Sequence, residues 1–235
     1  MQQAEDAVIE EQPPSRAMNA LVGTWSHLPT LAVLTLLTGT ALGMTAALVP
    51  IASPLFPVAL ALFVAPASTP LLAAALSAVD GTADGVRASA ARAWAARGAI
   101  FALTIPAGLA ASLTSVTVWL WSASGEDWLA IPFAVGVSGT VALLLVGLPA
   151  VAVVLREPRA GIVGAWTTGS VALLKRPIAV VAALGVVAFV AWIALAANLM
   201  LILLLAPLGA VASAYLLDSA HRVALAVAAV VDSEA

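Results

Sequence analysis

The sequence predicts an all-α membrane protein, a polytopic bundle of six transmembrane helices with both termini in the cytoplasm. Of its 235 residues 63% are hydrophobic and only 9% are charged, whereas about 25% of a soluble domain is charged. The mean hydropathy is +1.11. A soluble fold of this size needs far more polar surface, so the composition excludes a soluble globular protein and an intrinsically disordered one.

Six apolar stretches are long enough to cross the roughly 30 Å hydrocarbon core, which takes about 20 residues of helix. They are Leu28–Val49, Val58–Val79, Gly98–Trp121, Leu129–Leu155, Pro177–Asn198 and Met200–Leu217. They divide the chain into a polar cytoplasmic tail over 1–27, a transmembrane domain over 28–217, and a cytoplasmic C-terminal helix and tail over 218–235.

The turn between the last two stretches has two candidate positions. Pro177 to Leu217 carries no charge, and as one helix these roughly 41 residues would extend about 62 Å, so the chain must reverse. A turn at 206–209 would place Asp218 and its charged neighbours in the membrane core, at about 2.5–3.5 kcal/mol for each charge. We therefore expect the turn near Asn198, where its amide is solvated; inside the bundle the amide would instead bond another helix.

Proline and small residues recur inside these stretches. A proline removes one backbone donor and kinks its helix, which membrane helices tolerate when neighbours satisfy the freed carbonyl. Alanine and glycine allow helices to approach closely, so we favour tight packing over a mechanical hinge. The candidate structural kinks are Pro66, Pro70, Pro106, Pro149 and Pro207.

The positions of lysine and arginine predict the orientation. Cytoplasmic connections are enriched in these residues. Six helices put all nine bases of the chain on one side of the membrane, whereas five or seven would divide them between the two sides. These bases are Arg16, Arg87, Arg92, Arg97, Arg156, Arg159, Lys175, Arg176 and Arg222.

The two longer cytoplasmic connections are predicted to form short interfacial helices with a basic rim. The first follows a turn at Asp80-Gly81 and extends through Trp94, and the second follows Pro158. Each could anchor the chain to the membrane surface or contact a partner. The candidate partner-contact residues are Arg87, Arg92, Arg97, Arg156, Arg159, Trp166, Lys175 and Arg176.

The sequence predicts no catalytic, cofactor-binding or metal site, and no nucleic-acid binding. The chain has no cysteine, and its sequence pI is about 5.2. Gly136-Val137-Ser138-Gly139 resembles the GxSG motif of rhomboid intramembrane proteases, whose serine needs a histidine within about 3 Å. By helix rise Ser138 lies roughly 14 Å deep, whereas His221 lies roughly 30 Å from the same side, so we expect no proteolysis.

The order of features resembles the YesL-like family of bacterial membrane proteins, whose biochemical function is unknown. The similar segments are Ala65–Leu71, with two prolines among small residues, the basic tryptophan-containing stretch Arg87–Arg97, and Lys175-Arg176-Pro177. This resemblance implies a multi-pass protein of the bacterial plasma membrane, associated with carbohydrate uptake.

Two functions remain open at this stage. The first is a non-enzymatic accessory subunit of a carbohydrate ABC importer, whose partners besides the lipid bilayer would be the permeases with their ATPase and binding protein. The alternative is a self-sufficient small-solute transporter or channel, which needs a polar pathway. The helices offer only scattered serine and threonine, such as Thr35 and Ser112.

Overall fold

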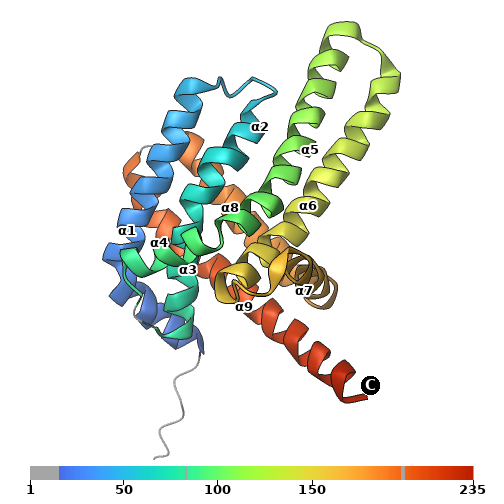
Figure 1. Cartoon of the computed structure of the whole chain (residues 1–235). Helices are drawn as coiled ribbons and strands as arrows, with labels where there is room; N and C mark the ends of the chain where they lie inside the picture. The colour runs from blue at the N-terminus through green and yellow to red at the C-terminus, as the bar shows by residue number, and fades with distance from the viewer. Residues whose placement is uncertain (1–15, 83, 197–198, 235) are drawn as a thin grey trace, which may run out of the picture.

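The computed structural model describes residues 16–82, 84–196 and 199–234, and every regular element in these ranges is a helix (Figure 1). The helices are α1 Arg16–Leu48, α2 Phe56–Ala59, α3 Ala65–Asp80, α4 Val86–Ala95, α5 Arg97–Ser124, α6 Ala130–Arg156, α7 Gly161–Lys175, α8 Pro177–Ala196 and α9 Leu199–Glu234. A π-helical segment, Leu60–Val64, joins α2 to α3, and a 3-10 turn, Asp127–Leu129, precedes α6. The all-α prediction is confirmed.

Four helical segments of the described chain are long and apolar enough to cross a membrane. They are Val22–Leu48, Phe56–Asp80, Arg97–Ser124 and Asp127–Arg156, and they overlap the first four predicted spans. The pair α7 and α8 is bent by 106° and provides a fifth if it is one broken span. The structure thus agrees with a multi-pass membrane protein of four to five such spans.

The chain reverses between α8 and α9, as expected. Asn198 itself lies outside the described residues, but α8 ends at Ala196 and α9 begins at Leu199. The Ser213 hydroxyl of α9 lies 3.4 Å from the Ala183 carbonyl oxygen of α8, and Gly209 faces Val190. The contact moves from Gly209 to Ser213 along α9 and from Val190 back to Ala183 along α8, so the two helices are antiparallel. The competing turn at 206–209 is wrong, because Pro207 lies inside α9.

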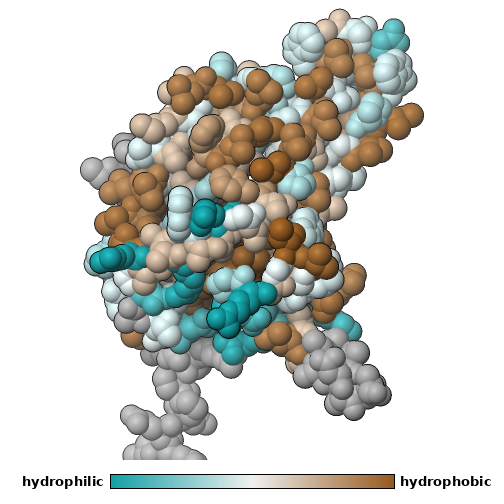
Figure 2. All heavy atoms as spheres, in the orientation of Figure 1, coloured by the Kyte–Doolittle hydropathy of each residue, from teal (hydrophilic) through white to brown (hydrophobic). Residues whose placement is uncertain are grey.

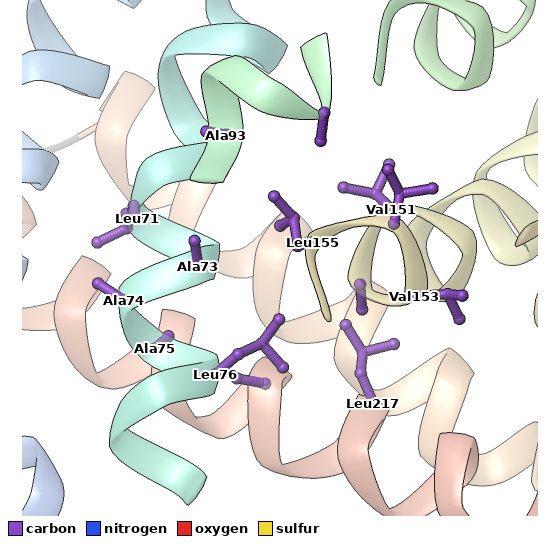
Figure 3. Packing of buried hydrophobic residues seen from close by; sticks show 14 of the residues in the cluster. Leu71, Ala73, Ala74, Ala75, Leu76, Ala93, Val151, Val153, Leu155 and Leu217 are labelled. Atoms are coloured by element: carbon purple, nitrogen blue, oxygen red, sulfur yellow. The ribbon is translucent and has the colours of Figure 1, made fainter. Parts of the chain in front are cut away.

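The core is built mainly from alanine, with leucine and valine between the helices. Leu76 of α3, Leu155 of α6 and Leu217 of α9 are almost fully buried in one cluster, and Figure 3 shows them beside the alanines of α3. Small side chains bring the helix axes close together, so backbone and Cβ atoms supply much of the contact area.

Two glycines mark places where one helix lies directly against the backbone of another. A methyl group on Gly23 of α1 would lie 2.3 Å from the Ala78 carbonyl oxygen of α3. One on Gly169 of α7 would lie 2.7 Å from the Val146 carbonyl oxygen of α6. Neither position has room for a side chain unless the backbones separate, which agrees with the predicted packing on small residues.

The predicted proline kinks all fall within helices. Pro70, Pro106, Pro149 and Pro207 lie inside α3, α5, α6 and α9. Pro66 is the second residue of α3, in its first turn. Because Pro70 has no N–H, the Pro66 carbonyl loses its helical donor, and the Thr69 hydroxyl donates to it instead at 2.7 Å.

One helix boundary and the position of one helix differ from the prediction. Helix α1 begins at Arg16, so part of the segment predicted as a polar tail is helical. Helix α4 confirms the helix predicted after Asp80-Gly81, where Gly81 has φ 72°. Helix α7 confirms the second predicted helix, but it buries Ala165 and Gly169, and the latter packs on α6. Helix α7 is therefore partly inside the bundle and not only on its surface.

Candidate functional site

Four charged side chains from three helices meet at one end of the bundle, in what we call the charge clasp: Asp80, Arg156, Asp218 and Arg222. Asp80 is the last residue of α3 and Arg156 is the last residue of α6. Asp218 and Arg222 lie one turn apart on α9. Asp80, Arg156 and Asp218 each directly follow the end of a predicted span, so the clasp lies where three spans end.

Arg156 bridges the two carboxylates of the clasp. Its Nη1 donates to Asp218 Oδ1 at 2.5 Å, and its Nη2 donates to Asp80 Oδ1 and Oδ2 at 3.0 and 3.1 Å. Arg222 donates from Nε to the other oxygen of Asp218 at 2.8 Å, and its Nη2 lies 3.7 Å from Asp80 Oδ1. Each guanidinium group thus faces both carboxylates. The pair between Asp218 and Arg222, one helical turn apart, is thus part of a larger network.

The clasp is shielded from water at its centre and open at its rim. The Asp218 side chain is 4% exposed and that of Arg156 is 15% exposed, whereas Asp80 and Arg222 are 35% and 42% exposed. Burial alone would raise the pKa of Asp218, which lies beyond the predicted span. Hydrogen bonds from Arg222 and Arg156 outweigh that effect and hold the pKa below its ordinary value. Asp218 is therefore charged near neutral pH.

His221 lies next to the clasp on α9, beyond the predicted span. Its side chain is 7% exposed, and neither its Nδ1 nor the Nε of Arg156 has a hydrogen-bond partner within the described chain. Burial lowers the pKa of His221, and the positive charge of Arg156 lowers it further. The imidazole is therefore held in its neutral form, with one buried nitrogen left unsatisfied.

A second, smaller cluster links α3 to α4. The Ser77 hydroxyl is buried and donates to Asp84 Oδ2 at 2.8 Å, and Arg92 forms an ion pair with the same oxygen. Arg92 Nη1 also lies 3.4 Å from the Ser77 hydroxyl. This cluster fixes the connection between α3 and α4 and gives Arg92 a structural role.

The candidate partner-contact residues divide into two groups. Arg92 and Arg156 form the ion pairs described above, and the Arg97 guanidinium lies 4.6 Å from the centre of the Trp94 ring. Trp166 is half-buried against the core. The others are exposed and form no ion pair within the part of the chain that the structure describes: Arg87, Arg159, Lys175 and Arg176.

Figure 2 shows hydrophilic residues on the lower half of the drawn face, around α4 and the ends of α3 and α6, whereas apolar residues cover α1 and most of the α5–α6 hairpin.

Ser138 lies on an exposed face of α6 and His221 is buried beside the clasp. Ser138 is spaced four residues from Ala134 and from Ala142, and all three are exposed on this face, which we call the α6 small-residue face. The outer half of the α5–α6 hairpin extends away from the other helices in Figure 1. Leu109, Leu113 and further large apolar residues of α5 are exposed.

The sequence analysis does not reveal the charge clasp, because it names Arg156 only as a candidate partner-contact residue. A signal was present, because three predicted spans that end on the same side are each followed by a charged residue, two negative and one positive.

No group of three or more potential metal ligands occurs among the described residues. Comparisons with protein-family models, curated proteins and solved structures find no match to the chain.

Proposed function

We propose that this chain is a non-enzymatic, multi-pass subunit of the bacterial plasma membrane that binds a helix of another membrane protein through the α6 small-residue face. The observation that carries this proposal is the exposure of Ala134, Ser138 and Ala142 at a four-residue spacing. Helices in lipid associate through close van der Waals contact, which small residues at this spacing permit. In this role Ser138 packs against a partner and performs no chemistry.

Its partner, on this proposal, is a permease of a carbohydrate ABC importer, as the resemblance to the YesL-like family implies. The exposed bases Arg87, Arg159, Lys175 and Arg176 add a cytoplasmic contact on the same complex. These side chains have no carboxylate partner within the described chain, so they are free to pair with a partner's acidic groups.

The test is a photo-crosslinking amino acid placed at Ala134 in living cells, with the same amino acid at Ala182, an exposed small residue of α8, as the matched control. We expect position 134 to crosslink to an importer permease and position 182 to crosslink only to lipid. Ser138→Ile should abolish the protein crosslink by blocking close approach, and Ser138→Ala should preserve it. Equal products at both positions would refute the proposal.

We further propose six spans with cytoplasmic termini. The contact between Asp80, Arg156 and Asp218 supports this topology, because predicted spans two, four and six then end on one side. In this arrangement α7 begins and ends on the cytoplasmic side, while Gly169 packs on α6. As half of a broken span it would place Lys175 and Arg176 at membrane depth, at about 2.5–3.5 kcal/mol each.

Single cysteines test the topology, since the chain has none of its own. Ala88, Ser124 and Thr167 are all exposed, so accessibility to the reagent depends on the side of the membrane. With an impermeant thiol reagent on intact cells, we expect Ala88→Cys and Thr167→Cys to stay unlabelled and Ser124→Cys to react. Labelling at 88 or 167 would contradict the six-span topology.

A self-sufficient transporter is the second candidate function, and it is favoured by the two buried ionisable residues Asp218 and His221 just beyond the end of the sixth predicted span. The purified protein in liposomes distinguishes the two candidates. Solute flux without any partner supports the transporter, whereas flux only after reconstitution with the permeases supports the subunit.

A further inference from the structure

The charge clasp joins three helices through few groups. Arg156 contacts Asp80 of α3 and Asp218 of α9, so this one guanidinium group links α3, α6 and α9. The apolar contacts beneath it involve mainly alanine, with Leu76 and Leu217. A change of charge inside the clasp therefore acts directly on the position of α9 against α3 and α6.

The clasp is electrically balanced, with two carboxylates and two guanidinium groups. The charged groups that act on His221 are Arg156, Glu157, Asp218 and Arg222. Among the other helices packed on α9, α8 carries no charged residue and Asp80 is within the clasp. The helices packed on α9 also carry the exposed Lys175 on α7, and Arg16 and His27 on α1.

We propose that His221 is a proton-binding site that opens the charge clasp and releases α9 from α3 and α6. A proton on the imidazole adds a third positive charge beside Arg156 and Arg222. The two carboxylates are already engaged by these arginines, and Nδ1 has no acceptor among the described residues. The protonated ring gains more by reaching water than by remaining buried.

The direction of the effect follows from linkage. The pKa of His221 is lowered by burial and by Arg156 in the closed form, whereas in the open form the imidazole reaches water and its ordinary pKa of about 6.5 applies. Acidification therefore favours the open form, by up to about tenfold per pH unit below that value. The pKa of Asp218 is also held low, from an ordinary value of about 3.9, so this carboxylate stays charged between pH 8 and pH 5.5.

The experiment measures the distance between α4 and α9 in the full chain in lipid nanodiscs. Spin labels on Ala88→Cys and Leu225→Cys, both exposed positions, report this distance by double electron–electron resonance between pH 8 and pH 5.5. We expect one distance at pH 8 and a second population that grows as the pH falls. His221→Gln should abolish this growth, and His27→Gln, at the other histidine of the chain, should leave it intact.

Two outcomes would overturn the inference. One is a distance distribution that stays constant from pH 8 to pH 5.5, and the other is an identical acid response in His221→Gln. If His221→Gln does not fold, carbon-13 NMR of labelled histidine in the His27→Gln protein reports the titration of His221 alone. A pKa at or above the ordinary value would then refute the proposal. The inference is independent of the partner proposed above, because the clasp and the α6 small-residue face are separate.

Discussion

Replacing Arg156 by methionine removes the group that links three helices and leaves Asp218 buried with one arginine in place of two. Breaking a buried ion pair from one side costs about 3–5 kcal/mol. Two features reduce this figure: Arg222 still donates to Asp218, and Asp80, at 35% exposure, can be hydrated in the variant. We therefore expect a loss of about 2–3 kcal/mol in the free energy of unfolding, or about 4–12 °C in Tm for a chain of this size.

Arg159→Met is the matched control, because Arg159 lies three residues further along, is exposed, and has no ion pair within the described chain. Thermal unfolding in mild detergent, followed by tryptophan fluorescence, compares the two variants. Combining Arg156→Met with Asp218→Leu should recover part of the loss, since no buried charge then remains unpaired. If Arg156→Met unfolds within about 1 kcal/mol of Arg159→Met, the clasp contributes little and the reasoning fails.

Three further predictions concern packing, pH and chemistry. Gly23→Ala should lower the free energy of unfolding by about 1–3 kcal/mol through overpacking, because the added methyl group meets the backbone of α3. Gly39→Ala, on the same helix but with open space around it, should be neutral or stabilising by up to about 1 kcal/mol. Equal unfolding curves for the two variants would contradict the close approach of α1 to α3. Acid should destabilise the protein, because the pKa values of Asp218 and His221 are both lowered in the folded state. Unfolding measured at a fixed temperature should show a free energy of unfolding that is constant above about pH 7, falls below about pH 6.5 because of His221, and falls again below about pH 4 because of Asp218. Ser138→Ala should leave any cellular phenotype unchanged, as an exposed serine of α6 does not contact His221, and a lost phenotype at normal protein abundance would contradict this.

The helices could be predicted from the sequence because crossing a membrane imposes a length and an apolar composition on each segment. The four segments that pass this test agree with the predicted ones. The reversal before α9 was also predictable, since one helix over Pro177–Leu217 would be about twice as long as the hydrocarbon core is thick. These arguments are local and need no knowledge of which helix lies beside which.

The clasp could not be predicted in the same way. Its ion pairs join residues that are 62 and 76 positions apart, and composition or periodicity does not specify such pairs. For the same reason the sequence presents Arg156 only as a candidate partner-contact residue. The position of α7 differs from the predicted interfacial one because the burial of Ala165 and the packing of Gly169 on α6 depend on how the helices pack, which hydropathy does not encode.

The sequence separation of the clasp residues has a consequence for biosynthesis. Arg156 precedes Asp218 by 62 residues, so the buried ion pair forms only after most of α9 has been translated. Until then, Arg156 can pair with Asp80 alone, and the earlier helices are held together mainly by alanine and glycine contacts. A chain stalled or truncated before Asp218 would therefore remain loosely assembled in the membrane, which makes it a ready substrate for membrane proteases.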